Sequence, residues 1–116
     1  MAKRRRKSFK VMTRRNPYEF DYHVLDNAIL REELGYIKNI ETETVFVYHN
    51  SIDKVWYVID IFTGLAATHG KTMYIAEKQF KADLQKYRDF KNTETYHNAI
   101  KKYNELLKNY MEVIKW

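Results

Sequence analysis

The fold is decided by residues 44–62, which read TVFVYHNSIDKVWYVIDIF. Two runs rich in β-branched and aromatic residues, 44–48 and 55–62, flank a turn composition at residues 50–53. Successive side chains of a strand point to opposite faces. In the second run one face carries Val55, Tyr57, Ile59 and Ile61, and the other carries Trp56, Val58, Asp60 and Phe62. Because both faces are largely apolar, the stretch predicts a β-hairpin that is at least partly covered on each side.

The sequence after the hairpin predicts one further strand and two helices. Residues 65–68 give a third strand after a Thr-Gly turn, so the predicted sheet has two or three strands. A helix is expected over residues 72–90, with Thr72 as its N-cap and apolar residues at steps of three and four. Residues 94–115 show three apolar registers with a spacing of seven and predict the second helix. Their broad stripe favours an intramolecular helical hairpin, and hence a monomer, over a dimer seam.

The region ahead of the hairpin, residues 18–38, is predicted to be helical or of mixed structure. Asp26 is a suitable N-cap, and Gly35 is a suitable C-terminal stop. The apolar face of this helix comprises Ala28, Ile29, Leu30 and Leu34. The chain therefore predicts a short N-terminal helix before the sheet.

The positive charges are concentrated at the N-terminus. The first fifteen residues hold eight positive charges and no acid, whereas the other 101 residues hold 13 bases and 15 acids. The eight cations are Lys3, Arg4, Arg5, Arg6, Lys7, Lys10, Arg14 and Arg15. Like charges repel, apolar residues are sparse, and Asn16-Pro17 ends the segment with a turn signal. Residues 1–17 are therefore expected to form a flexible, disordered basic arm.

Together these elements predict an α+β fold. It consists of the disordered basic N-terminal arm, the short N-terminal helix, a two- or three-stranded antiparallel sheet and a C-terminal helical hairpin on one sheet face. Residues 1–17 form the arm, and residues 18–116 form a single α+β domain of about one hundred residues.

The composition excludes several classes of function. The chain has no cysteine, which rules out disulfides, thiolate zinc sites and cysteine nucleophiles. The four histidines lack the spacing of a zinc site, and neither a metal nor another cofactor is expected. No apolar run is long enough to span a membrane, and the basic start lacks the apolar segment of a signal peptide. The sequence thus predicts a soluble, cytoplasmic protein without a membrane partner and without catalytic residues.

Lys71, Trp56 and Tyr57 are further candidates for contact with a partner. Residues 64–72 follow a strand and precede a helix, as a phosphate-binding loop does, but five residues separate their glycines where that loop has four. Lys71, at the start of the predicted helix, can still hold a backbone phosphate. Trp56 and Tyr57 can stack on bases if the sheet is exposed, or belong to the core. Asp60 is expected to face solvent or to bond to a turn.

A local resemblance concerns residues 56–64, WYVIDIFTG, and residues 70–76, GKTMYIA. These segments resemble the small DNA-binding domains at the N-termini of tyrosine integrases, which combine a three-stranded sheet with a helix. Those domains use a Trp-bearing hairpin, a Thr-Gly turn and a Gly-x-Thr-x-x-x-Ala helix start. The resemblance implies DNA binding by the sheet. The integrase domains carry several Arg and Lys on the sheet, whereas the strands here offer only Lys54 and Lys71.

In its make-up the chain is similar to small proteins of phages and mobile elements from low-GC Gram-positive bacteria. It is short, free of cysteine and rich in Tyr, Lys, Asn and Ile. Some anti-CRISPR proteins share this make-up, with a basic flexible N-terminus ahead of an α+β body. This second resemblance implies inhibition of a host CRISPR nuclease.

Charge and resemblance together predict a non-enzymatic protein that binds nucleic acid, DNA or RNA, or a nucleoprotein such as a CRISPR effector, through its basic arm. One alternative is a DNA-binding or transcriptional accessory protein that reads the duplex with its sheet. A small enzyme that uses His23 or His69 is a third possibility. The residues predicted to contact the partner are the eight arm cations together with Trp56, Tyr57 and Lys71.

Overall fold

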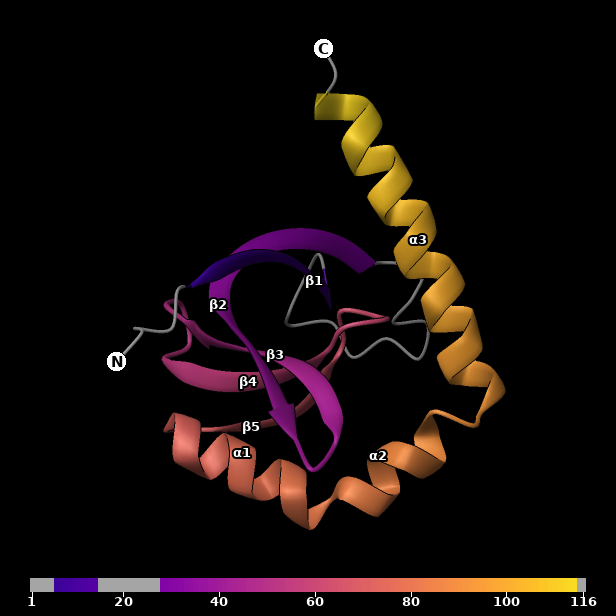
Figure 1. The fold of residues 1–116 in the computed structure, drawn as a ribbon. Helices are drawn as coiled ribbons and strands as arrows, with labels where there is room; N and C mark the ends of the chain where they lie inside the picture. The colour runs from indigo at the N-terminus through magenta and orange to yellow at the C-terminus, as the bar shows by residue number, and fades with distance from the viewer. Residues whose placement is uncertain (1–5, 15–27, 115–116) are drawn as a thin grey trace.

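In the part of the chain that the structure describes, an antiparallel sheet precedes three helices (Figure 1). The structure, a computed structural model, describes residues 6–14 and 28–114, and the side chains of residues 6–13 and 28–110. The strands are β1 (Lys7–Arg14), β2 (Ala28–Ile40), β3 (Glu43–Asn50), β4 (Val55–Asp60) and β5 (Ala66–Gly70), and their order in the sheet is that of the sequence. The helices are α1 (Met73–Ala82), α2 (Leu84–Phe90) and α3 (Glu94–Ile114).

The sheet folds over on itself at Gly35, in the middle of β2. β1 pairs with residues 28–35 of this strand, whereas β3 pairs with residues 35–40, so the two neighbours flank different halves of β2. A Cβ atom at Gly35 would lie 2.3 Å from the carbonyl oxygen of Val47 and 2.8 Å from the ring of Phe46. Glycine therefore permits the close crossing that gives β2 its curved course in Figure 1.

Apolar side chains fill the space between the two halves of the folded sheet. The buried members are Val11 of β1, Phe46 and Tyr48 of β3, and Ile59 of β4. The ring of Phe9 stacks on that of Phe46 with a centroid distance of 4.9 Å. Full burial of a valine or phenylalanine side chain contributes roughly 1.5–3 kcal/mol. Apolar contact therefore holds the β1–β2 hairpin against β3 and β4.

Helices α1 and α2 cover the other face of β3, β4 and β5 (Figure 1). The buried residues of this layer are Ile40, Val45, Val47, Val58, Ala76, Phe80 and Tyr87. Thr72 caps α1, because its side-chain oxygen accepts a hydrogen bond from the amide of Ile75 at 3.1 Å. The Thr68 hydroxyl donates to the carbonyl oxygen of Ala76 at 2.9 Å and so joins α1 to β5.

Helix α3 lies along the side where β1 meets the loop after β4. Met12 of β1 packs against Ala99 and Tyr103 of α3. The Tyr103 hydroxyl donates to the carbonyl oxygen of Lys10 at 2.6 Å, and the Met12 amide donates to that of Gly64 at 2.8 Å. These contacts close the folded sheet on the side opposite its bend. In the part of the chain that the structure describes, none of the helices is long and apolar enough to cross a membrane.

Several predicted elements are confirmed. β3 and β4 are antiparallel across the turn that follows Asn50, as predicted for the hairpin. The strand predicted at residues 65–68 corresponds to β5, and Thr72 is the N-cap of the next helix. The helix predicted at residues 94–115 is α3.

The predicted sheet of two or three strands and the predicted short N-terminal helix are wrong. The sheet has five strands, and residues 28–38 lie within β2; residues 18–27 of the predicted helix lie outside the described residues. The segment is rich in helix formers, but its pairing with β1 and the packing of Ala28 and Leu30 near α3 override that propensity. Gly35, expected to end a helix, is the bend of the sheet.

The predicted disordered arm is wrong for residues 7–14, which form β1. Phe9 and Val11 alternate with Ser8 and Lys10 and enter the interior of the folded sheet. This period of two is a strand signal that the density of positive charge conceals. Except for Arg6, the rest of the predicted arm and its boundary lie outside the described residues.

The predicted C-terminal helical hairpin is wrong as well. The helix expected at residues 72–90 is interrupted at Asp83, which separates α1 from α2. Helix α3 packs on β1 and β2 instead of pairing with α1. Its apolar stripe therefore meets the two strands that the sequence did not predict, and these take the place of a partner helix.

Candidate nucleic-acid interface

The cations of the predicted arm occupy different positions on and before β1. Arg6 and Lys7 are exposed at the start of the strand. Lys10 lies in its middle, and Arg14 ends it. The other four, Lys3, Arg4, Arg5 and Arg15, lie outside the described residues. The run of five consecutive cations at residues 3–7 therefore leads directly into β1.

Lys10 is engaged within the fold. Its Nζ lies 3.1 Å from Oε1 of Glu32 on β2 and 4.7 Å from the ring centre of Tyr110 on α3. The Lys10 side chain is 20% exposed. The Ser8 hydroxyl also donates to Glu32, and the hydrogen bonds from Ser8 and Lys10 lower the pKa of that carboxyl. Lys10 thus joins β1 to its neighbours and is not available to a ligand in the way that the exposed cations are.

Lys7 stands at one end of a row of register partners that crosses all five strands. Lys7 lies opposite Gly35, Gly35 opposite Tyr48, Tyr48 opposite Tyr57, and Tyr57 opposite His69. The row passes through the bend of the sheet. It therefore places the start of β1 and the end of β5 at the same end of the molecule.

Lys71 belongs to this end too. It is exposed in the short connection between β5 and α1, two residues after His69. In Figure 1 this is the end at which β1 and α1 both begin, on the left of the view. The structure thus brings Arg6, Lys7 and Lys71 to one end of the sheet, although they were predicted on different grounds.

Trp56 and Tyr57 point to opposite faces of β4 and do not form a common stacking platform. Trp56 is half-buried against the layer beneath α1, and its ring centre lies 5.3 Å from that of His49. Tyr57 lies on the other face, with ring-centre distances of 5.6 Å to Tyr48 and 6.0 Å to His69. Of the two predicted aromatic contacts, Tyr57 is the one that belongs to the row of register partners from Lys7 to His69.

The tyrosine hydroxyls at this end carry their protons at neutral pH. Burial, together with the negative charge of Glu33, raises the pKa of Tyr48 to about 12. The Tyr57 hydroxyl donates a hydrogen bond to Asp53, and burial and this bond raise its pKa as well. Both side chains are therefore neutral at pH 7.

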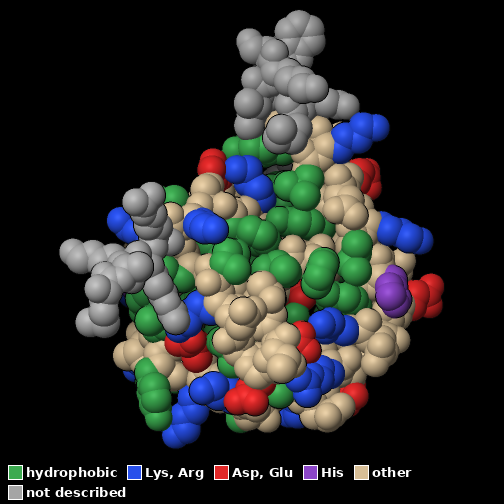
Figure 2. Space-filling view, viewed as in Figure 1, with side chains coloured by type: hydrophobic (Ala, Val, Ile, Leu, Met, Phe, Trp, Pro, Cys, Tyr) green, Lys and Arg blue, Asp and Glu red, His purple; other side chains and the backbone are tan. Residues whose placement is uncertain are grey.

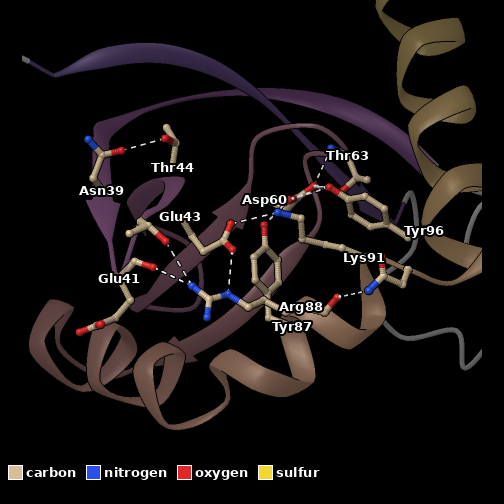
Figure 3. A network of polar contacts seen from close by, with 12 residues as sticks. Asn39, Glu41, Glu43, Thr44, Asp60, Thr63, Tyr87, Arg88, Lys91 and Tyr96 are labelled. Carbon is tan, nitrogen blue, oxygen red and sulfur yellow. Dashed lines mark hydrogen bonds and ion pairs between the residues drawn. The ribbon is translucent and has the colours of Figure 1, made fainter.

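The buried polar cluster around Asp60 serves the fold. Asp60 is 3% exposed, and its carboxylate accepts hydrogen bonds from the amide and hydroxyl of Thr63 at 2.9 and 2.8 Å. The hydroxyls of Tyr87 and Tyr96 donate to the same carboxylate (Figure 3). Because its acceptor sites are used by α2, α3 and its own turn, Asp60 ties three parts of the chain together. Of the two expectations for Asp60, the bond to a turn is the one observed.

Ion pairs join Glu43 of β3 to Arg88 and Lys91 at the end of α2, and Glu77 of α1 to Lys38 of β2. Glu43 accepts hydrogen bonds from Nε of Arg88 at 3.1 Å and from Nζ of Lys91 at 2.9 Å (Figure 3). Burial raises the pKa of Glu43, but these two partners outweigh that effect and the pKa is lowered. Nζ of Lys38 lies 2.5 Å from Oε1 of Glu77 on α1. These pairs fasten the helices to β2 and β3.

Sequence reasoning missed a second cationic region. Residues 71–91 hold six Lys and Arg against three acids, a net charge of +3. The exposed lysines among them are Lys71, Lys78, Lys81 and Lys86. Lys and Arg side chains are visible along the lower edge of Figure 2, over α1 and α2. This excess of positive charge is visible when residues 71–91 are counted by themselves. It is hidden in the net charge of −2 that residues 16–116 carry together.

Among the described residues, no group of three His, Asp or Glu side chains could hold a metal ion. Comparison of the chain with protein-family models, with curated proteins and with solved structures finds no match. Function is therefore inferred from the charge, exposure and geometry of its own residues.

Proposed function

We propose that the protein binds nucleic acid through the cations at the start of β1. The observation that carries the proposal is the placement of Arg6 and Lys7. Both are exposed, and they continue the run of cations at residues 3–7 into a strand whose own Lys10 is already paired. A run of cations without acids fits a polyanion, and DNA and RNA both present one.

The chemistry of this contact is phosphate neutralisation. A guanidinium donates two hydrogen bonds to one phosphate, and each neutralised phosphate releases condensed counterions into solution. β1 is held by its pairing with β2 and by the hydrogen bond from Tyr103 to the Lys10 carbonyl. A ligand at Arg6 and Lys7 therefore meets a strand that is already in place and does not have to be ordered.

The same geometry argues against the alternative in which the sheet reads a DNA groove. A sheet that enters a groove needs an uncovered face. Here α1 and α2 pack on one face of β3 and β4, and the folded-over β1–β2 hairpin packs on the other. We therefore favour contact by the N-terminal cations over contact by the central strands.

The proposal is tested by the salt dependence of binding. Fluorescence anisotropy with labelled 20-nucleotide single-stranded and duplex DNA and RNA, between 50 and 200 mM salt, gives the slope of log K against log salt concentration. Replacement of Arg4, Arg5 and Arg6 by Gln removes three cations, so the slope should become shallower by about 2 to 3. The affinity at low salt should fall accordingly.

A matched control removes the same charge elsewhere. Lys101, Lys102 and Lys108 lie on α3, away from the start of β1, and their joint replacement by Gln should leave the slope nearly as it was. Equal effects of the two triple variants would show that net charge, and not the β1 end, governs binding. Absence of any measurable binding to the four nucleic acids would refute the proposal.

A further inference from the structure

We infer that the solvent-facing side of α1 is a second contact for nucleic acid and that Tyr74 on this side selects single strands. This inference rests on the proposed function and adds the class of ligand to it. The residues involved lie in α1 and just before it, outside both the basic first fifteen residues and the β3–β4 hairpin.

The first observation is the exposure of Tyr74. Its side chain, in the first turn of α1, is 72% exposed, and the neighbouring Ile75 is 47% exposed. The opposite side of the helix is occupied by Ala76 and Phe80, which are fully buried against the sheet. The Tyr74 ring is therefore presented to solvent by a helix that is firmly packed.

The second observation is the spacing of lysines around this ring. Tyr74, Lys78 and Lys81 follow one another at steps of four and three, which places them along one side of α1, and Lys71 lies in the connection just before the helix. All three lysines are exposed, and Nζ of Lys78 lies 6.0 Å from the ring centre of Tyr74. The stripe therefore combines an aromatic face with positive charge on both sides of it.

The third observation is that the acid on α1 is not part of this stripe. Glu77 is paired with Lys38 of β2, with 2.5 Å between Nζ and Oε1. Among the described residues, no ion pair involves Lys71, Lys78 or Lys81. Their charge therefore remains available to a polyanion.

The combination of ring and lysines determines which polyanion fits. Bases of a single strand offer their π-faces for stacking on an aromatic side chain, whereas bases in a duplex are stacked on one another. Phosphates on either side of a stacked base would meet the flanking lysines. The α1 stripe thus matches single-stranded DNA or RNA better than a duplex, which it could meet only through charge.

Lys71 connects this stripe to the start of β1. It follows His69, whose register row leads across the sheet to Lys7. Four strand-to-strand steps of about 4.8 Å separate β1 from β5, or roughly 19 Å along the sheet. One strand of nucleic acid can therefore contact the N-terminal cations and continue over Lys71 to Tyr74.

The experiment compares single-stranded and duplex ligands with variants of Tyr74. Anisotropy with a labelled 20-nucleotide oligothymidylate and a 20-base-pair duplex is measured for Tyr74→Leu, Tyr74→Phe and the control Lys101→Gln. Loss of the ring in Tyr74→Leu should weaken single-strand binding about 5- to 150-fold. Tyr74→Phe keeps a ring and should bind nearly as the parent does, and duplex binding should change little in all three variants.

A covalent readout locates the contact directly. An oligonucleotide that carries 5-bromodeoxyuridine at successive positions, irradiated with the unchanged protein, should yield a peptide crosslinked at Tyr74. Unaltered single-strand affinity in Tyr74→Leu, while the variant of Arg4, Arg5 and Arg6 loses affinity, would overturn this inference and leave the proposed function intact. Equal losses for duplex and single strand would also overturn it, and no binding by the parent would overturn both.

Discussion

The amide of Met12 donates a hydrogen bond of 2.8 Å to the carbonyl oxygen of Gly64, so the outer edge of β1 is joined to the loop that follows β4. This bond connects the two halves of the folded sheet at the side away from the bend. The Tyr103 ring lies against the same glycine, because a Cβ there would be 2.6 Å from its Cε1 atom. Gly64, which has no side chain, therefore contacts both β1, where the sheet is closed, and Tyr103 of α3.

Gly64→Ala should consequently destabilise the protein strongly. The residue has φ of +70°, a conformation that costs other residues about 1–3 kcal/mol. The added methyl group also overlaps Tyr103 and the Met12 amide, for which overpacking adds about 1–3 kcal/mol. Urea unfolding followed by circular dichroism should show a total loss of about 2–6 kcal/mol. Ala82→Gly at the exposed end of α1 is the control and should lose about 1 kcal/mol or less.

Gly35→Ala tests the bend of β2. The added Cβ would lie 2.3 Å from a backbone oxygen, that of Val47, which cannot turn aside as a side chain can. The two halves of β2 must then separate, and a loss of about 1–3 kcal/mol or failure to fold is expected. Hydrogen exchange of the β1 and β2 amides should increase before that of α1. Unchanged stability and exchange would show that the crossing at Gly35 is loose.

The Asp60 cluster should be the most sensitive polar part of the fold. Asp60→Ala would leave the hydroxyls of Tyr87, Tyr96 and Thr63 without their acceptor, at about 1–3 kcal/mol for each buried group left unsatisfied. A total loss of about 3–5 kcal/mol in urea unfolding is expected. Tyr96→Phe removes one donor and should lose about 1–3 kcal/mol. A loss below about 1 kcal/mol for Asp60→Ala would mean that water replaces the carboxylate.

Stability should also decline in alkali. Burial raises the pKa of Tyr87 and Tyr96 above the ordinary tyrosine value of 10, and the bonds to Asp60 add to this. The folded protein therefore holds these protons more tightly than the unfolded chain does. The contribution is complete below about pH 10 and is lost as the pH rises above that value toward the folded-state pKa values. The free energy of unfolding, measured from about pH 8 to 11, should fall less steeply in Tyr96→Phe than in the parent.

The elements that the sequence predicts correctly are those whose local pattern agrees with their final surroundings. β3 and β4 have β-branched and aromatic residues on both faces, and both faces are covered. The α3 helix has a clear apolar stripe, and Thr72 caps α1 through its own side chain. In β1 and β2 local composition and tertiary environment disagree. Positive charge dominates the sequence of β1, and helix-forming residues dominate that of β2. Each of the two segments nevertheless forms a strand, because it pairs with the other.

The candidate interface could be predicted in part for a similar reason. The run of cations at residues 3–7 is plain in the sequence, but nothing local reveals that Lys10 turns toward Glu32. The row from Lys7 to His69 depends on four strand registers, which no single segment specifies. The stripe around Tyr74 shows a helical spacing, yet its exposure follows from the packing of α1 on β5.

The hydrogen bond from the Tyr103 hydroxyl to the Lys10 carbonyl joins residues that are 93 positions apart. During translation the first two strands leave the ribosome early, but the helix that contacts the border of β1 is made long afterwards. In that interval β1 is an exposed edge strand of the nascent hairpin, and other polypeptides can pair with its backbone. A chaperone that shields the emerging chain until α3 has been synthesised should therefore raise the yield of correctly folded protein.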